Sequence, residues 1–297
     1  MKIVQTLIFI FTILFLTFSC SSHKEAVQVS AKNDTQKIVS QPQVPEPPEP
    51  PIVSNPNHEP ELVVEEAISH ETQDEEITIK IDSTFNHNLF DSVLKTYVSS
   101  KGNVDYKSLK NNPENLRVYI KSLGTHLPNE LWSKNDKLAF WINAYNAMTI
   151  DLIIRNYPVK SIKDIKDPWD QRLWKLGSKW YNLNEIEHQI LRKMNEPRIH
   201  FAIVCASFSC PKLENTAYNG SELETQLNTV TKSFLSDGTK NNISQNTLEL
   251  SKIFKWFAKD FKENGSLIDF LNSYTDVEIS DSAKKSYKDY NWDLNEN

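Results

Sequence analysis

The strongest constraint on the fold of this chain is a proline cluster between residues 41 and 60, which holds eight of the fourteen prolines in the 297-residue sequence. Such a segment cannot bury enough apolar surface to offset the entropy of ordering it, so it is expected to stay extended. The acidic run ELVVEEAISHETQDEEITIKID follows and adds charge repulsion. Residues 21–82 are therefore predicted to be a disordered Pro/Glu-rich tether, which leaves residues 83–297 to build the fold.

The first twenty residues carry one lysine and then an apolar run from Ile3 to Phe18. The run is shorter than the roughly 20 residues that span a bilayer, and it is typical of a signal peptide. The end of this segment, TFSC, resembles the lipobox of bacterial lipoproteins, although Thr17 stands where leucine is usual. The resemblance implies residues 1–20 as a lipoprotein-type signal peptide and Cys20 as the lipidated residue. An ordinary signal peptide cleaved nearby is the alternative.

A lipid on Cys20 would anchor the chain to a membrane without spanning it. The expected location is the outer membrane of the cell envelope, on its periplasmic or its surface face. The net charge of −6 comes largely from the tether, and no strongly basic face is present. No nucleic-acid partner is therefore predicted. The partner expected besides the membrane is an unidentified envelope peptide, polymer or protein.

The pattern of residues 83–297 predicts an α+β fold, a mostly helical single domain packed around a small β-sheet. Helical spacing is clearest in SKNDKLAFWINAYNAMTIDLIIRNYP, with Ser133 as its cap and Pro158 as its stop. Further helices are expected in NHNLFDSVLKTYVS, YNLNEIEHQILRKM and SLIDFLNSY, and strands in HFAIVC and NTLELS.

Polar side chains project into apolar helix faces at two places. Glu187 falls in the middle of the apolar arc of its helix, where an unpaired carboxylate tends to protonate. The neighbouring His188 is placed either at a site or on the exposed side, paired with Glu185. Asn143 and Asn146 lie among isoleucines of the long helix and need hydrogen-bond partners. They either satisfy the backbone of a loop that crosses the helix or line a cleft and hold a substrate carbonyl or a catalytic histidine.

Several irregular strings of this chain, among them FWINAYNA, NEIEHQILR, CASFSCP, KIFKWFAKDF and the closing YNWDLN, resemble the DUF547 family, a domain of unknown function. The resemblance extends from about Asn103 to Asn295. It departs from the family at Asn291, where aspartate usually precedes the tryptophan. The positions that match the family's motifs are Asp105, Tyr106, Trp141, Asn143, Tyr145, Asn146, Glu187, His188, His200, Cys205, Ser209, Cys210 and Pro211.

Cys205 and Cys210 form an even pair if Cys20 is lipidated, and disulfides persist in an oxidising envelope. A disulfide that closes so short a loop would stabilise the folded protein by only about 2 kcal/mol. The alternative is that Cys205 is a nucleophile, which needs a base that a third group orients. His200 lies an odd five residues before Cys205, so in a strand the two side chains would point to opposite faces. His188, on a separate helix, is then the better-placed base, with Glu187 or Asn143 to orient it.

The C-x4-C spacing has no second cysteine pair, so neither a metal nor a cofactor is predicted. Three hypotheses remain. The first is a thiol-dependent hydrolase or transferase of a peptide, amide or thioester, with Cys205, His188, His200, Glu187 and Asn143 as catalytic residues. It assigns binding to Asn146, Trp141, Tyr145, Asp105, Tyr106 and Ser209. The second is a thiol–disulfide redox partner. The third is a non-catalytic binding or scaffold domain with a Cys205–Cys210 disulfide.

Overall fold

Helix α4 (Lys134–Asn156) forms the centre of the fold in the computed structural model, which describes residues 84–296. Every residue from Leu138 to Ile154 is buried, because neighbouring elements cover the helix on all sides. As predicted, the Ser133 side chain caps its N-terminus by accepting a hydrogen bond from the Asp136 N–H. The helix ends before the Tyr157–Pro158 pair, also as predicted.

The described residues contain eight α-helices, and short 3₁₀ and π segments join several of them. Besides α4, the α-helices are α1 (Asn88–Tyr97), α2 (Tyr106–Asn111), α3 (Glu114–Leu123), α5 (Leu183–Glu185), α6 (Leu223–Ser236), α7 (Ile253–Trp256) and α8 (Leu267–Asn272). The 3₁₀ helices are η1 (Ile162–Asp164), η3 (Leu191–Met194), η4 (Pro197–Phe201) and η5 (Asp260–Lys262), and η2 (Ile186–Ile190) is a π-helix.

Two small sheets complete the domain. Strands β1 (Trp174–Leu176) and β2 (Lys179–Tyr181) form an antiparallel hairpin. In the second sheet β4 (Thr247–Leu250) lies between β3 (Asn242–Ile243), which is antiparallel to it, and β5 (Lys284–Tyr287), which is parallel. The predicted α+β class is confirmed, as is the predicted strand in NTLELS.

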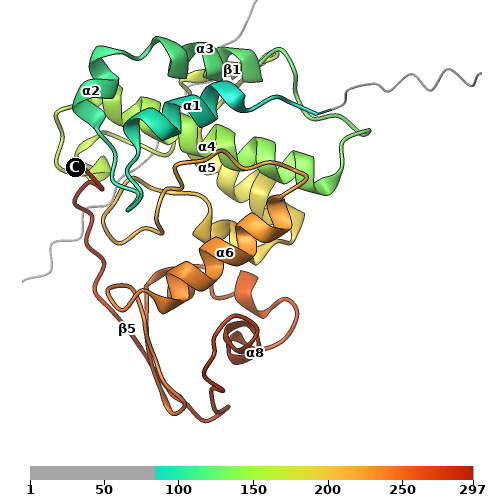
Figure 1. The fold of residues 1–297 in the computed structure, drawn as a ribbon, viewed down its shortest axis with the longest axis vertical. Helices are drawn as coiled ribbons and strands as arrows, with labels where there is room; N and C mark the ends of the chain where they lie inside the picture. The colour runs from blue at the N-terminus through green and yellow to red at the C-terminus, as the bar shows by residue number, and fades with distance from the viewer. Residues whose placement is uncertain (1–83, 297) are drawn as a thin grey trace, which may run out of the picture. The chain divides into compact units, whose positions relative to one another are not determined.

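Figure 1 shows how these elements are layered. Helices α1 and α3 pack beside α4, and α6 lies on the other side of α4, towards the sheet that contains β5 and towards α8. The end of the chain runs from β5 back towards α2. It bridges Glu296 to Val104, Asp293 to Ser161 and Leu294 to Ser207. We call residues 290–296 the C-terminal strap.

The predicted strand HFAIVC is not a strand. The chain forms the 3₁₀ helix η4 up to Phe201 and then continues as irregular backbone. The side chain of Asn146 takes the place of a strand partner: its Nδ2 donates to the Ala202 carbonyl (2.9 Å), and its Oδ1 accepts from the Val204 N–H (3.0 Å). A short apolar run indicates burial without specifying the backbone conformation, and here a buried amide satisfies the backbone instead of a sheet.

The signal peptide (1–20) with Cys20 and the whole tether (21–82) lie outside the described residues, so these expectations stay predictions. The described residues belong to one compact unit, Glu75–Asn297. Within residues 84–296, none of the helices is both long and apolar enough to cross a membrane.

Replacing Asn146 by alanine should lower the free energy of unfolding by about 2–4 kcal/mol, because the buried Ala202 carbonyl and Val204 N–H would both lose their partners. Urea unfolding of the two proteins measures the change. The matched control is Asn156→Ala at the exposed end of the same helix, where we expect a loss below about 1 kcal/mol. Equal losses for the two variants would contradict this account.

Candidate functional site

A cavity of about 350 Å³ brings together residues from six separate parts of the described chain. Four of the five residues predicted to be catalytic line the cavity: Glu187, His188, His200 and Cys205. Two other predicted site residues, Tyr145 and Cys210, also line it. Its volume is at the small end of the range for small-molecule sites. Within residues 84–296, no group of three or more His, Cys, Asp and Glu side chains is placed to hold a metal ion.

Glu187 is buried, as the helical projection predicted. It lies in the π-helical turn η2, a distortion that is frequent at functional sites. The Tyr145 hydroxyl donates to its Oε2 (3.0 Å), and within residues 84–296 Oε1 has no hydrogen-bond partner. Burial raises the pKa of Glu187 to about 7, against the weaker opposing effects of Tyr145 and Arg192. The side chain can therefore donate or accept a proton near neutral pH.

His188 is half-buried at the cavity and does not pair with Glu185, contrary to one of the two expectations. Glu185 instead binds Arg172 (2.7 Å) and Lys179. Arg192 donates to His188 Nδ1 (2.9 Å), which leaves the ring proton of the neutral imidazole on Nε2. Burial and the Arg192 charge lower the pKa of His188.

His200 belongs to a hydrogen-bonded chain that the sequence did not predict. Its Nε2 lies 2.8 Å from Asp260 Oδ2, and Arg192 binds both oxygens of Asp260 at 2.6 Å. Burial alone would raise the pKa of Asp260, but the bonds from Arg192 and His200 outweigh it and hold that pKa well below the usual range. The carboxylate is therefore ionised and accepts the Nε2 proton, so Nδ1 of a neutral His200 is an unprotonated acceptor.

His200 and Cys205 do not point to opposite faces of a strand, as was predicted, because this segment is not a strand. His200 lies in the 3₁₀ helix η4, and irregular backbone separates it from Cys205, so the alternation of a strand does not apply. Both side chains line the same cavity. Burial keeps the pKa of His200 low despite the neighbouring Asp260 carboxylate, so the ring is neutral and able to act as a base.

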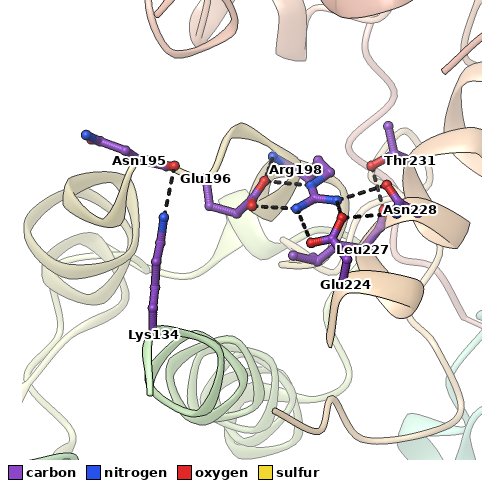
Figure 2. Close-up of polar contacts among 8 residues, drawn as sticks. All are labelled: Lys134, Asn195, Glu196, Arg198, Glu224, Leu227, Asn228 and Thr231. Atoms are coloured by element: carbon purple, nitrogen blue, oxygen red, sulfur yellow. Dashed lines mark hydrogen bonds and ion pairs between the residues drawn. The ribbon is translucent and has the colours of Figure 1, made fainter. Parts of the chain in front are cut away.

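The position of η4 depends on Arg198, two residues before His200. Figure 2 shows its guanidinium between Glu196 and Glu224. It binds the first through Nε and Nη2 (2.7 and 2.6 Å) and the second through Nη1 and Nη2 (2.6 and 2.9 Å). Asn228 Oδ1 also accepts from Nη1 (2.9 Å). Because Glu224 and Asn228 belong to α6, this bidentate pairing fixes the His200 segment to that helix.

Cys205 and Cys210 are joined in a disulfide on the cavity wall. Cys205 is partly exposed and Cys210 is buried. The Tyr290 hydroxyl lies 3.3 Å from Cys205 Sγ and 3.2 Å from Cys210 Sγ, and burial raises the pKa of Tyr290 to about 12. Ala206, next to the disulfide, has φ of 56°, a left-handed conformation that costs a non-glycine residue about 1 kcal/mol.

Asn143 does not line the cavity, so the structure does not bring it together with the other predicted catalytic residues. It is fully buried, and its amide bonds the backbone of Tyr218 in both directions, at 2.8 and 2.9 Å. Asn146 holds the segment before Cys205 in the same way. The simpler expectation, that the two amides satisfy backbone crossing the helix, is confirmed. Trp141, predicted as a binding residue, is buried and packs on Phe140 (5.1 Å between ring centroids) instead of lining the cavity.

Three other predicted binding residues make local contacts away from the cavity. Asp105 caps α2 by accepting from the Ser108 N–H (2.9 Å), and the Tyr106 hydroxyl donates to Asn295 (2.7 Å). Ser209 Oγ accepts from the Asn291 N–H (2.8 Å), which attaches the disulfide loop to the C-terminal strap. These contacts position backbone, and none of the three side chains borders the cavity.

Sequence reasoning missed several cavity residues that come from the last fifth of the described chain or from the loop before β1. They are Trp169, Trp256, Phe257, Tyr290 and Trp292, and behind them Asp260. Periodicity carried no signal for these positions. Most of them do lie inside the strings KIFKWFAKDF and YNWDLN, which carried the family resemblance.

Comparison with known families gives one match. Residues 129–235 match the family model described as "Protein of unknown function, DUF547". The DUF547 match runs from the start of α4 almost to the end of α6, and it contains Glu187, His188, His200 and both cysteines. Asp260 and the C-terminal strap lie outside it. No curated protein and no solved structure matches this chain.

The raised pKa of Glu187 should make stability depend on pH. Between pH 4.5 and about 7 the folded protein holds a proton on Glu187 that the unfolded chain has lost, so stability falls as pH rises through this range. Relative to Glu187→Gln, the native protein should lose roughly 3 kcal/mol of unfolding free energy between pH 4.5 and 7.5. Urea unfolding of both proteins at several pH values measures this difference in unfolding free energy. The control Glu114→Gln is exposed and should leave the slope unchanged, whereas a pH-independent difference for Glu187→Gln would refute the buried-acid assignment.

Proposed function

We propose that this domain is a thiol-dependent hydrolase or transferase that acts on a peptide, amide or thioester. The observation that carries the proposal is that Cys205, His200 and Glu187 line one cavity, together with His188. A nucleophile, an oriented base and a proton donor are the groups that acyl transfer requires. A non-catalytic scaffold domain does not require a cysteine, a histidine and a buried carboxyl group around one cavity.

The active form of the site is the reduced form. A dithiol reductant supplies two electrons and two protons, and the Cys205–Cys210 disulfide opens to two thiols. Cys205 is the sulfur that reductant and substrate can reach, because it is partly exposed whereas Cys210 is buried. Cys205 is therefore the nucleophile and Cys210 the residue that closes the site on oxidation.

His200 is the base. Its Nδ1 accepts the Cys205 thiol proton, and the Asp260 carboxylate, 2.8 Å from Nε2, stabilises the resulting imidazolium. Arg192 holds that carboxylate in place through two bonds of 2.6 Å. The sulfur attacks the acyl carbon, the carbon–nitrogen or carbon–sulfur bond to the leaving group breaks, and the proton on His200 passes to the leaving amine or thiol.

Glu187 and Tyr290 are the groups that act on the acyl oxygen and the leaving group. With a pKa of about 7, Glu187 is partly protonated at neutral pH and can donate a hydrogen bond to the acyl oxygen or a proton to the leaving group. Tyr290, whose hydroxyl is 3.3 Å from Cys205 Sγ, stays protonated and can donate to the oxyanion. Water or an acceptor nucleophile then releases the acyl group from Cys205.

We propose that this chemistry takes place in the cell envelope, with the chain attached to the outer membrane through a lipid on Cys20. The tether at residues 21–82 would let the domain reach an envelope peptide, polymer or protein. If so, Cys20→Ala should move the protein from the membrane fraction to the soluble fraction of the producing cell. Equal membrane association of the two proteins would argue against the anchor.

Iodoacetamide labelling followed by peptide mapping tests the assignment of Cys205 and His200. The oxidised protein should not label at residue 205, reduction with dithiothreitol should expose Cys205, and Cys210→Ser should label there without reductant. In the reduced protein, His200→Gln should slow labelling at pH 7 by about tenfold, because no base then accepts the Cys205 proton as the sulfur attacks.

The control for that experiment is His126→Gln, an exposed histidine away from the cavity, which should leave the labelling rate unchanged. Labelling of the reduced protein at the same rate with and without His200 would reject the base. Failure of reduced Cys205 to label under any condition would reject the nucleophile.

A second candidate is thiol–disulfide exchange, which the disulfide on the cavity wall favours. Glu187 could then supply or remove the proton of the exchanging thiol. Equilibration with glutathione buffers measures the reduction potential. A value above about −300 mV is expected for exchange, and a lower value would mark the disulfide as structural.

A further inference from the structure

Four aromatic side chains form a continuous surface on one side of the cavity, which we call the indole wall: Trp169, Trp256, Tyr290 and Trp292. The Trp256 and Trp292 ring centroids are 5.8 Å apart at an angle of 29°, and Tyr290 lies 4.7 and 4.6 Å from them. Trp169 meets Trp292 edge-on at 6.0 Å. Trp256 is 46% exposed, so a large indole face is available to a ligand.

The charges around the cavity limit what can bind there. Among the described residues that line it, none is lysine or arginine. Arg192, which contacts His188 of the lining, is already engaged by Asp260 and His188. Lys163 Nζ lies 5.2 Å from the Trp292 ring centroid, but Lys163 does not line the cavity. The lining residues therefore offer no cation to a phosphate or carboxylate, and a neutral ligand fits the site better.

Beside this apolar surface, Asp170 and Asn184 give the cavity lining groups that suit hydroxyls. Asn184 Nδ2 donates to Asp170 Oδ1 (3.0 Å), and both side chains border the cavity and are exposed or partly exposed. A carboxylate accepts from hydroxyl groups, and an amide both donates to them and accepts from them. An aromatic platform with such a pair beside it matches a ligand that has one apolar face and a hydroxyl-bearing edge.

We propose that the indole wall binds a pyranose ring and that the substrate of the site is an N-acylated amino sugar. Such a ring presents axial C–H groups to the indole face and hydroxyl groups to Asp170 and Asn184. Its N-acyl amide would extend towards Cys205 on the same cavity. Tyr290 is tilted by about 50° to its two neighbours, so the wall is stepped and suits a puckered ring better than a flat one. The substrate assignment rests on the proposed acyl transfer, whereas the sugar site itself does not.

The test is titration of the oxidised full chain with triacetylchitotriose, followed by calorimetry. In this form Cys205 is in the disulfide, so binding is measured without turnover. Trp256→Ala should weaken binding by about tenfold, and Trp256→Phe by no more than about threefold, because it keeps an aromatic face. Asp170→Ala should also weaken binding. Trp180→Ala is the matched control, since Trp180 is 51% exposed but lies away from the cavity, and it should bind like the unchanged protein.

Several outcomes would overturn the sugar site: no binding of triacetylchitotriose, equal affinities for the Trp256→Ala and Trp180→Ala variants, or tighter binding of the flat ligand N-acetyltryptophanamide. This result is separable from that of Cys205 labelling. Sugar binding with an unreactive Cys205 would leave a sugar-binding site and reject the acyl transfer. A reactive Cys205 without sugar binding would reject only the sugar.

Discussion

Two hydrogen bonds from Asn146 hold the segment on which the candidate site depends. The amide pairs with the Ala202 carbonyl and the Val204 N–H, midway between His200 and Cys205. Without a strand partner, these two buried backbone groups have no other hydrogen-bond partner within residues 84–296. Helix α4 is covered on all sides, so its amide is held rigidly, and it transfers that rigidity to the irregular chain beside the cavity. Helices and strands hold their residues through their own backbone hydrogen bonds, whereas here the Asn146 side chain holds a loop through two hydrogen bonds.

The two carboxyl groups near the site differ in their partners: Asp260 is paired with charged and ring N–H donors, and Glu187 is not. Asp260, Arg192 and His200 form a closed network in which the carboxylate is paired on both oxygens. Glu187 has only the Tyr145 hydroxyl on one oxygen and no cation in contact, so burial dominates and its pKa rises to about 7. The two carboxyl groups are thus set apart by their surroundings, one permanently ionised and one able to exchange a proton, which is the arrangement that acid–base chemistry at neutral pH requires.

Part of this organisation could be predicted from the sequence. The helical wheel placed Glu187 in an apolar face, and the two asparagines of α4 were expected to need hydrogen-bond partners, because both inferences follow from a local period of 3.6 residues. The strand predicted in HFAIVC was wrong, since a short apolar run indicates burial but not conformation, and that error carried over to the pairing of His200 with Cys205. Asp260 and Tyr290 come 60 and 85 residues after their partners and were not found, because long-range contacts leave no periodic trace in one sequence.

The central claim is that reduced Cys205 accepts an acyl group with the help of His200, and intact-mass spectrometry measures this directly. The reduced protein is incubated with phenyl thioacetate, quenched in acid and digested to locate the adduct. The account predicts one acetyl group on Cys205, absent from Cys205→Ser and formed about tenfold more slowly in His200→Gln. An unmodified Cys205, or acetylation that proceeds at the same rate without His200, would contradict it.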